Sequence, residues 1–93
     1  MSKKTKVLII DDDKTLSNMY KERLELSGFE AMVSYNGEAG LSRISQEKPD
    51  VILLDLMIPK LDGYSVLATI KSDPEIKNIP VIILSALTRS SDK

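Results

Sequence analysis

Three short, unbroken apolar runs constrain the fold of this chain more than any other feature of its sequence. They are Val7–Ile10, Val51–Leu54 and Val81–Leu84. A strand without polar alternation is typical of a parallel sheet in which helices cover both faces. The runs are followed directly by polar residues, namely Asp11, Asp55 and Ser85. The sequence therefore predicts a parallel sheet with polar side chains at the carboxyl ends of its strands.

The segments between these runs have helical or turn character. Lys14–Ser27 has the period of an amphipathic helix and is followed by Gly28, a residue favoured just after a helix ends. Its predicted apolar stripe consists of Leu16, Met19, Tyr20 and Leu24. Phe29–Tyr35 alternates as an edge strand does, and Glu38–Glu47 and Tyr64–Ser72 are predicted helices. Strands thus alternate with helices, which is the pattern of an α/β fold.

Length and composition exclude several classes of protein. The 93 residues form at most one domain, expected to span 1–93 with polar ends at 1–5 and 88–93. Without cysteine or histidine, the chain cannot form disulfides, a histidine-ligated metal site or a Ser-His-Asp triad. A net charge of −1 argues against direct binding of duplex DNA, and no apolar run is long enough to span a bilayer. The expected location is the cytoplasm.

Acidic residues follow two of the apolar runs. Taken alone, Asp11–Asp13 can be read as the capped start of a helix, and Asp55 as a turn residue. If the two runs are neighbouring strands, however, these carboxylates meet at one edge of the sheet. Like charges at one place are unfavourable unless a cation compensates them, and carboxylate oxygens suit Mg²⁺. A carboxylate beside Mg²⁺ can also act as a nucleophile towards a phosphoryl group, and Ser85 could donate a hydrogen bond to it.

The chain resembles the receiver domain of two-component response regulators over about residues 5–90. The matching stretches are Val7–Asp13, Gly28–Phe29, Pro49–Pro59, Lys60–Gly63 and Ile79–Ala86. The resemblance implies an α/β fold with a doubly wound parallel sheet of flavodoxin-like topology and strand order 2-1-3-4. It also implies that Pro59 and Gly63 shape the loop that follows Asp55.

The same resemblance implies roles for individual residues. Asp55 is the expected phosphoacceptor, which takes its phosphoryl group from a phosphohistidine of a sensor histidine kinase or a phosphotransfer protein. The expected Mg²⁺ ligands are Asp12 and Asp55 directly, Asp11 through water, and the backbone carbonyl of Met57. Ser85 matches the switch hydroxyl, whereas Asp13 is expected to start a helix. Such a domain is a self-phosphorylating phosphoacceptor, and autodephosphorylation is left open; it is not an enzyme in the usual sense.

The sequence also departs from the family pattern. Members continue with a fourth helix, a fifth strand and a fifth helix, which bring a lysine and an aromatic switch residue, and no residue here matches these two. The chain is therefore expected to be a receiver domain that is incomplete at the carboxyl end. A single helix on one face would leave side chains of Val7–Ile10 and Val51–Leu54 exposed, and Val81–Leu84 would be an apolar edge. We expect self-association or completion by another chain, without membrane binding.

Two alternatives remain open at this point. Asp11, Asp13 and Thr15 match the Asp-x-Asp-x-Thr motif of haloacid-dehalogenase-type phosphohydrolases, in which Asp11 would be the nucleophile and Asp13 the general acid. That reading leaves Asp55 without a role. The other alternative is a receiver-like interaction module that binds a partner without being phosphorylated.

Overall fold

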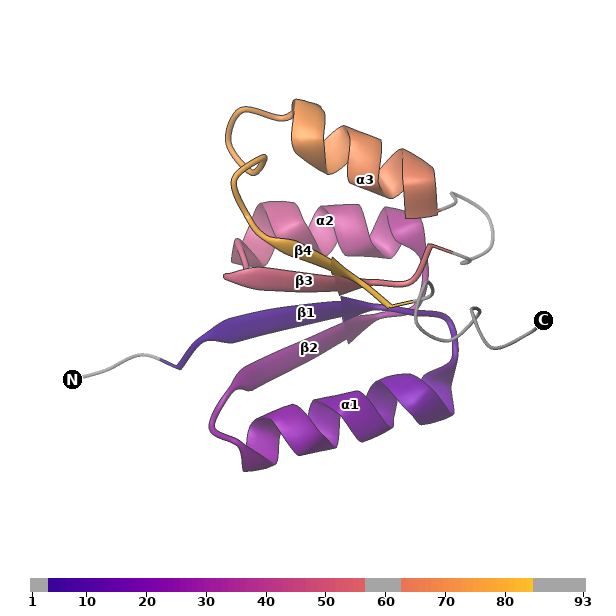
Figure 1. Cartoon of the computed structure of the whole chain (residues 1–93), viewed down its shortest axis with the longest axis vertical. Helices are drawn as coiled ribbons and strands as arrows, with labels where there is room; N and C mark the ends of the chain where they lie inside the picture. Colours follow the sequence, from indigo (N-terminus) through magenta and orange to yellow (C-terminus); the bar gives the residue numbers. More distant parts are fainter. Residues whose placement is uncertain (1–3, 57–62, 85–93) are drawn as a thin grey trace.

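The computed structural model describes residues 4–56 and 63–84, and it confirms the predicted alternation of strands and helices (Figure 1). The elements are β1 (Lys6–Ile10), α1 (Lys14–Leu26), β2 (Glu30–Ser34), α2 (Gly37–Glu47), β3 (Val51–Leu54), α3 (Gly63–Ser72) and β4 (Val81–Ile83). The bounds differ from the predicted ones by a few residues at most. Gly28, with a φ of 97°, follows the end of α1 as the sequence suggested.

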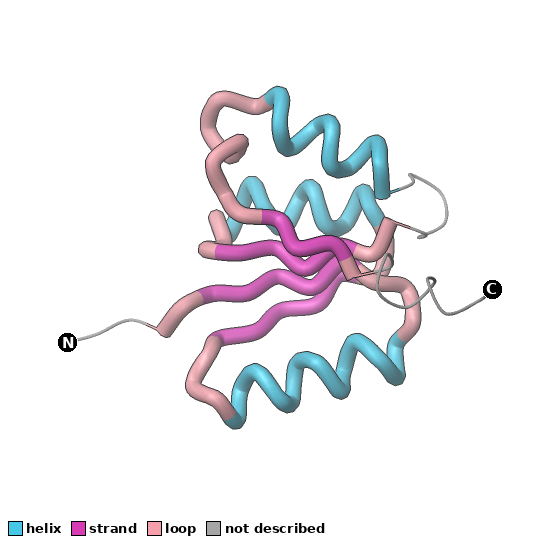
Figure 2. Tube along the Cα trace, viewed as in Figure 1, coloured by secondary structure: helices cyan, strands magenta, loops and turns pink. Residues whose placement is uncertain are grey.

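All neighbouring strands of the sheet are parallel, in the order β2-β1-β3-β4 (Figure 2). This is the order that the family resemblance implied. Because crossovers between parallel strands are right-handed, reversing direction along the sheet after β2 moves the helices to the other face. Figure 1 shows the result: α1 covers one face, and α2 and α3 cover the other. The fold is therefore a doubly wound parallel sheet.

The main core lies between the sheet and the α2–α3 layer. Its buried members are Leu8, Ile10, Ile44, Ile52, Leu54, Val66, Ile70 and Ile76. A glycine allows α2 to approach β1 closely, since a Cβ atom at Gly40 would lie 2.6 Å from the Cδ1 atom of Ile10. Ile10 is fully buried and precedes Asp11, so this contact fixes the end of β1. The core thus supports the strand ends at which the acidic residues stand.

The face covered by α1 is packed differently from the prediction. Ser17 is the buried residue of α1, whereas Met19 is 51% exposed, so its place in the predicted apolar stripe was wrong. Leu16, Tyr20 and Leu24 are only partly buried. Hydrophobic periodicity identifies a buried face only from its apolar residues. It therefore cannot detect a small serine at the centre of that face. The predicted stripe is thus correct for Leu16, Tyr20 and Leu24 and wrong for Met19, and it omits Ser17.

Exposure increases across the sheet on the α1 face. The paired residues Ile9, Leu53 and Ile82 form a row on this face, because each is opposite the next in the strand register. Ile9 is fully buried, Leu53 is partly buried and Ile82 is 50% exposed. The expectation that β1 side chains remain exposed was therefore wrong, since α1 packs over β1 and β2. Among the described residues, none of the helices is long and apolar enough to cross a membrane.

The exposed side chain of Ile82 predicts that the purified 93-residue chain self-associates through β4. In a purified sample another copy of the chain can cover this side chain, and burying its exposed half would contribute about 1 kcal/mol to the association. Ile82→Thr keeps a β-branched residue and should weaken the association, measured by sedimentation velocity over a range of concentrations. Met19→Gln, which removes an equally exposed apolar side chain from α1, is the matched control and should leave association unchanged. A wild-type monomer at every concentration would contradict the prediction.

Candidate metal centre

Three carboxylates meet at the carboxyl end of the central strands. β1 and β3 pair so that Ile10 is opposite Leu54, and the Asp55 N–H donates to the Ile10 carbonyl at 2.9 Å. Carboxylate oxygens of Asp11, Asp12 and Asp55 consequently lie within 4.8 Å of one another. The structure thus brings together the three acidic residues that the sequence analysis proposed as metal ligands. Their roles remain predictions.

The donor set and its exposure fit a hard divalent cation. Asp11 is 2% exposed, Asp55 is partly buried and Asp12 is exposed, so one side of the group opens to solvent. Mg²⁺ typically uses one or two protein carboxylates and keeps several water ligands, which such an opening allows. Oxygen-only coordination also matches a chain without cysteine or histidine. The residues present therefore fit Mg²⁺.

Asp11 is fixed by hydrogen bonds on both its backbone and its side chain. Its N–H donates to the Ser34 carbonyl at 3.0 Å, which ties the end of β1 to β2. Its Oδ1 accepts from the N–H of Asp13 at 3.0 Å, and its carbonyl accepts from the Ser17 hydroxyl at 3.1 Å. These bonds hold the sharp turn from β1 into α1. The sequence analysis did not identify Ser17 or Ser34, because isolated serines carry no recognisable motif.

Asp13 belongs to the helix start and lies outside the three-carboxylate group. It is the N-cap of α1, and its Oδ1 accepts from the Leu16 N–H at 3.0 Å. Such a bond satisfies one of the unpaired N–H groups of the first helical turn. This confirms the interpretation of Asp13 as a helix-start residue. Its carboxylate is engaged by the helix, which does not suit the general-acid role of the hydrolase alternative.

The candidate acceptor is confined by the start of α3. Gly63 donates its N–H to the Leu56 carbonyl at 3.2 Å. A Cβ atom at Gly63 would lie 2.7 Å from the carbonyl oxygen of Asp55 and would also collide with the Leu56 backbone. Only glycine fits this approach, which supports the expected role of Gly63 in shaping the loop. Met57, Pro59 and Ser85, for which roles were expected, lie outside the described residues.

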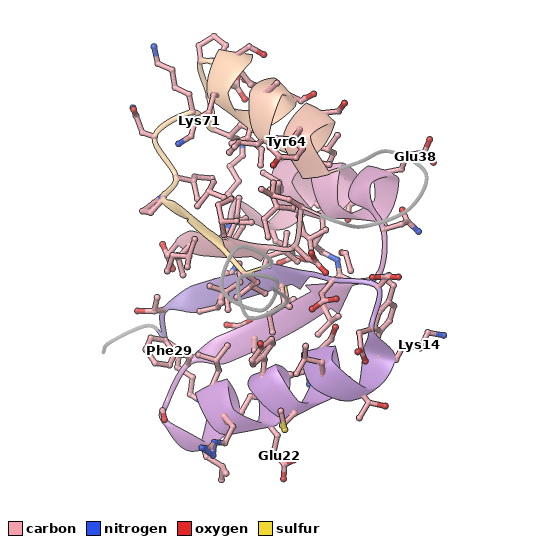
Figure 3. The ribbon with its side chains drawn as sticks, turned by 45° about the vertical axis from the view of Figure 1, so that its right-hand side comes forward. Lys14, Glu22, Phe29, Glu38, Tyr64 and Lys71 are labelled. Atoms are coloured by element: carbon pink, nitrogen blue, oxygen red, sulfur yellow. The ribbon has the colours of Figure 1, made fainter. Side chains whose placement is uncertain are left out.

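A positively charged lysine side chain lies beside the same end of the sheet. Lys14, labelled in Figure 3 at the start of α1, places its Nζ 5.3 Å from the ring centroid of Tyr35, which follows β2. Cation–π contacts of this kind contribute about 0.5–1 kcal/mol at exposed positions. Neither residue was singled out from the sequence, since the contact depends on the β1–β2 pairing. It fixes a positive charge near the acidic end of β1.

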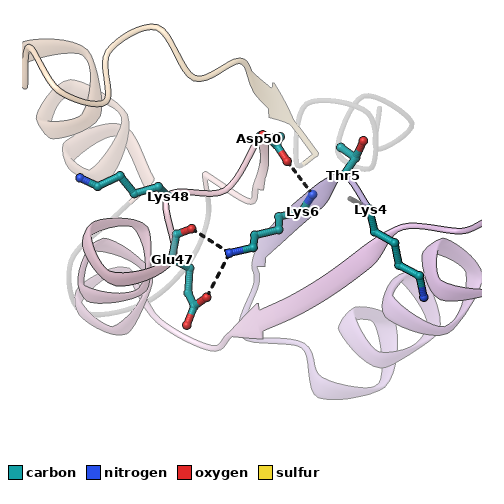
Figure 4. Close-up of a pocket in the computed structure, with 6 residues that line it drawn as sticks. All are labelled: Lys4, Thr5, Lys6, Glu47, Lys48 and Asp50. Atoms are coloured by element: carbon teal, nitrogen blue, oxygen red, sulfur yellow. Dashed lines mark hydrogen bonds and ion pairs between the residues drawn. The ribbon is translucent and has the colours of Figure 1, made fainter. Parts of the chain in front are cut away.

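A cavity of about 490 Å³ lies at the opposite, amino-terminal end of β1 and β3 (Figure 4). Its lining residues are Lys4, Thr5, Lys6, Glu47, Lys48 and Asp50. The Lys6 Nζ pairs with the Glu47 carboxylate at 3.5 Å and donates to the Glu47 carbonyl at 3.3 Å. The Lys6 N–H donates to the Asp50 carboxylate at 2.8 Å. These contacts join the start of β1 to the end of α2 and to the residue just before β3.

Burial raises the pKa of Asp11 from 3.8 to about 6. The hydrogen bond from the Asp13 N–H lowers this pKa, whereas the neighbouring Asp55 and Asp12 raise it. In the metal-free protein, repulsion from Asp55 and Asp12 thus disfavours the ionised form of Asp11. A bound cation would reverse this balance, because opposite charge favours the ionised carboxylate.

Comparison with known proteins identifies the chain's relatives. A family model described as the response regulator receiver domain matches residues 7–93. A probable transcriptional regulator, ycf27 of Guillardia theta, is 40% identical over 90 residues, covering 97% of this chain and 34% of that protein. The DNA-binding dual master transcriptional regulator RpaA of Synechocystis is 39% identical over 88 residues, covering 95% of this chain and 36% of that protein. The chain thus spans about a third of these relatives' length.

A solved structure shows the same fold. The receiver domain of the Francisella response regulator 1452 is 41% identical and superposes with a TM-score of 0.81. The match covers 89% of this chain and 67% of the Francisella chain. The sheet order and helix placement described above are therefore those of an experimentally known receiver domain.

The raised pKa of Asp11 predicts that the metal-free protein loses stability as the pH rises. The folded protein keeps the Asp11 proton up to about pH 6, whereas the unfolded chain releases it near pH 3.8. The stabilisation is thus fully present below pH 3.8 and lost as the pH rises through about 6. Urea unfolding in a chelating buffer should show a loss on the order of 2 kcal/mol over this range.

Two variants separate Asp11 from its neighbour. Asp11→Asn should flatten this pH dependence and raise the stability of the metal-free protein at neutral pH, because it removes the buried charge. Asp13→Asn keeps a good N-cap residue and should leave the pH dependence as in the wild type. A pH dependence that persists in Asp11→Asn would assign the effect to another group.

Proposed function

The chain belongs to the response regulator receiver family, and from this premise we propose that it accepts a phosphoryl group on Asp55 in a Mg²⁺-dependent reaction. One observation carries the proposal: Asp55 leaves β3 beside Asp11 and Asp12, with carboxylate oxygens of all three within 4.8 Å. A nucleophilic carboxylate next to a cation site is the arrangement that phosphoryl transfer to an aspartate requires. Asp55 is only partly buried, so a phosphodonor can reach it.

In the proposed reaction, a carboxylate oxygen of Asp55 attacks the phosphorus of a phosphohistidine. The new O–P bond forms as the N–P bond breaks. The electron pair of the N–P bond stays on the imidazole nitrogen of the donor. Mg²⁺ would be held directly by Asp12 and Asp55 and through water by Asp11, with the Met57 carbonyl as a further ligand. It would neutralise charge on the transferred oxygens. Ser85 is proposed to donate a hydrogen bond from its hydroxyl to a phosphoryl oxygen after the transfer.

The proposed partner is a sensor histidine kinase or a phosphotransfer protein, and the proposed location is the cytoplasm. The RpaA name describes DNA binding, but it belongs to a protein of which this chain matches 36%. A chain with a net charge of −1 lacks the basic excess that duplex binding uses. We therefore assign phosphoryl acceptance, and not direct DNA contact, to these 93 residues.

Neither alternative gains support. The hydrolase reading needs Asp13 as a general acid, but Asp13 caps α1. It also leaves unexplained why Asp55 joins the carboxylate group. A binding module without phosphorylation would not need three carboxylates in one place, an arrangement that is unfavourable without a cation.

Asp55→Asn tests the acceptor. Incubated with Mg²⁺ and acetyl phosphate, the wild-type chain should gain one base-labile phosphoryl group, detected by intact-protein mass spectrometry. Asp55→Asn should gain none, because its amide is not a nucleophile. Asp13→Asn is the matched control and should be phosphorylated like the wild type. Phosphorylation that survives in Asp55→Asn and disappears in Asp11→Asn would favour the hydrolase alternative.

A second test ranks the aspartates by their effect on Mg²⁺ affinity. Asp12→Asn should weaken binding most, by roughly tenfold or more, because it removes a direct ligand. Asp11→Asn should weaken binding less, because it acts through water, and Asp13→Asn should have the smallest effect. The dissociation constants can be measured by following backbone amide shifts during Mg²⁺ titration. An equal loss from all three would indicate a diffuse acidic patch instead of a defined site.

A further inference from the structure

We propose that Ser17 is a positioning residue that aims Asp11 and Asp12 at the cation. Ser17 is 0% exposed and stands in the first turns of α1, directly behind the turn that carries the acidic residues. Its hydroxyl donates to the Asp13 carbonyl at 2.7 Å and lies 3.1 Å from the Asp11 carbonyl, sharing one proton between them. This inference rests on the proposed Mg²⁺-dependent function.

The two carbonyls that Ser17 contacts flank Asp12 in the chain. Asp12 is exposed, so packing does not hold its side chain, and the backbone on either side sets its direction. The Ser17 hydroxyl holds the peptide unit before Asp12 through the Asp11 carbonyl and the unit after Asp13 through the Asp13 carbonyl. The peptide unit between Asp12 and Asp13 is held by the bond from the Asp13 N–H to the Asp11 carboxylate, so all the backbone around Asp12 is fixed. Ser17 therefore acts on the Asp12 carboxylate without touching it.

A comparison within the fold separates this contact from an ordinary helical one. Serine and threonine in helices often donate to the carbonyl four residues earlier, and Thr69 in α3 does so to Ser65 at 2.9 Å. Ser17 makes the same bond to Asp13, but it also reaches Asp11, six residues earlier and outside the helix. The second contact links α1 to the end of β1. It is the one that an ordinary helical serine lacks.

The free-energy cost of burying the Ser17 hydroxyl also supports its proposed positioning role. A buried hydroxyl is unfavourable unless it is hydrogen-bonded, and alanine is a better helix former at an interior position. At a fully buried position between helix and sheet, an apolar side chain would pack without that cost. The two hydrogen bonds from Ser17 to the Asp11 and Asp13 carbonyls explain why a serine occupies this buried position. Groups that orient metal ligands from behind commonly change metal affinity by about 10-fold or more when removed.

The test compares Ser17→Ala with Thr69→Ala, which removes an equivalent helical hydroxyl bond far from the acidic residues. Ser17→Ala should raise the Mg²⁺ dissociation constant by about fivefold to tenfold, whereas Thr69→Ala should leave it unchanged. Ser17→Thr keeps the hydroxyl and should restore most of the affinity. Unfolding curves for all variants show whether each is folded. Wild-type affinity in a folded Ser17→Ala protein would overturn the proposal, as would equal losses in both alanine variants.

A second measurement needs no metal. In the metal-free protein, hydrogen exchange of the Asp13 amide reports the bond from Asp13 to the Asp11 carboxylate. Ser17→Ala should accelerate this exchange relative to the amides of α3, and Thr69→Ala should not. If the wild type does not bind Mg²⁺, the proposed function fails, but accelerated exchange would still support the positioning role of Ser17. Unchanged exchange in Ser17→Ala would overturn that role.

Discussion

The parallel pairing of β1 with β3 is the interaction on which the acidic site depends. Asp11 and Asp55 are distant in the sequence, and they become neighbours because Ile10 pairs with Leu54. A shift of the register by one residue would turn one carboxylate to the opposite face of the sheet. The register is held by the core, since Ile10 and Leu54 point into the layer that α2 and α3 cover. Hydrophobic packing on one face therefore determines the geometry of charged groups at the edge.

Placing three carboxylates together has a cost that the rest of the domain offsets. The raised pKa of Asp11 shows that burial and its acidic neighbours disfavour its ionised form in the metal-free protein. The opposite end of β1 has the reverse arrangement, in which the Lys6 ammonium pairs with the Glu47 carboxylate and the Lys6 backbone N–H donates to the Asp50 carboxylate. A cation that binds only the folded state would add stability by mass action. Repulsion at the acidic edge thus lowers the stability of the metal-free protein, and a bound cation would raise it.

The sequence predicted most of the fold because its strongest signals are local. The unbroken runs Val7–Ile10 and Val51–Leu54 identify buried strands without knowledge of their neighbours, and the aspartates that follow indicate the site. The strand order came from the family resemblance. Hydrophobic periodicity identified most of the packed face of α1, but it could not show that this face buries Ser17 and leaves Met19 exposed. Nor could it explain Gly40, whose low helix propensity argues against α2 but whose missing side chain admits Ile10.

Hydrogen bonds at the turn into α1 hold one side of the acidic site in addition to apolar packing. Asp55 follows a strand fixed by apolar packing, so its position is coupled to the stability of the whole domain. Asp11 also follows a buried core residue, Ile10, but the turn that carries Asp11 and Asp12 is held in addition by hydrogen bonds from Ser17 and to Ser34. A substitution in the core is expected to displace Asp55 only by disturbing the whole fold. Under the proposed role of Ser17, loss of its hydroxyl would alter the turn in a protein that remains folded. If the carboxylates bind a cation as proposed, substitutions on the α1 side would change metal affinity separately from stability.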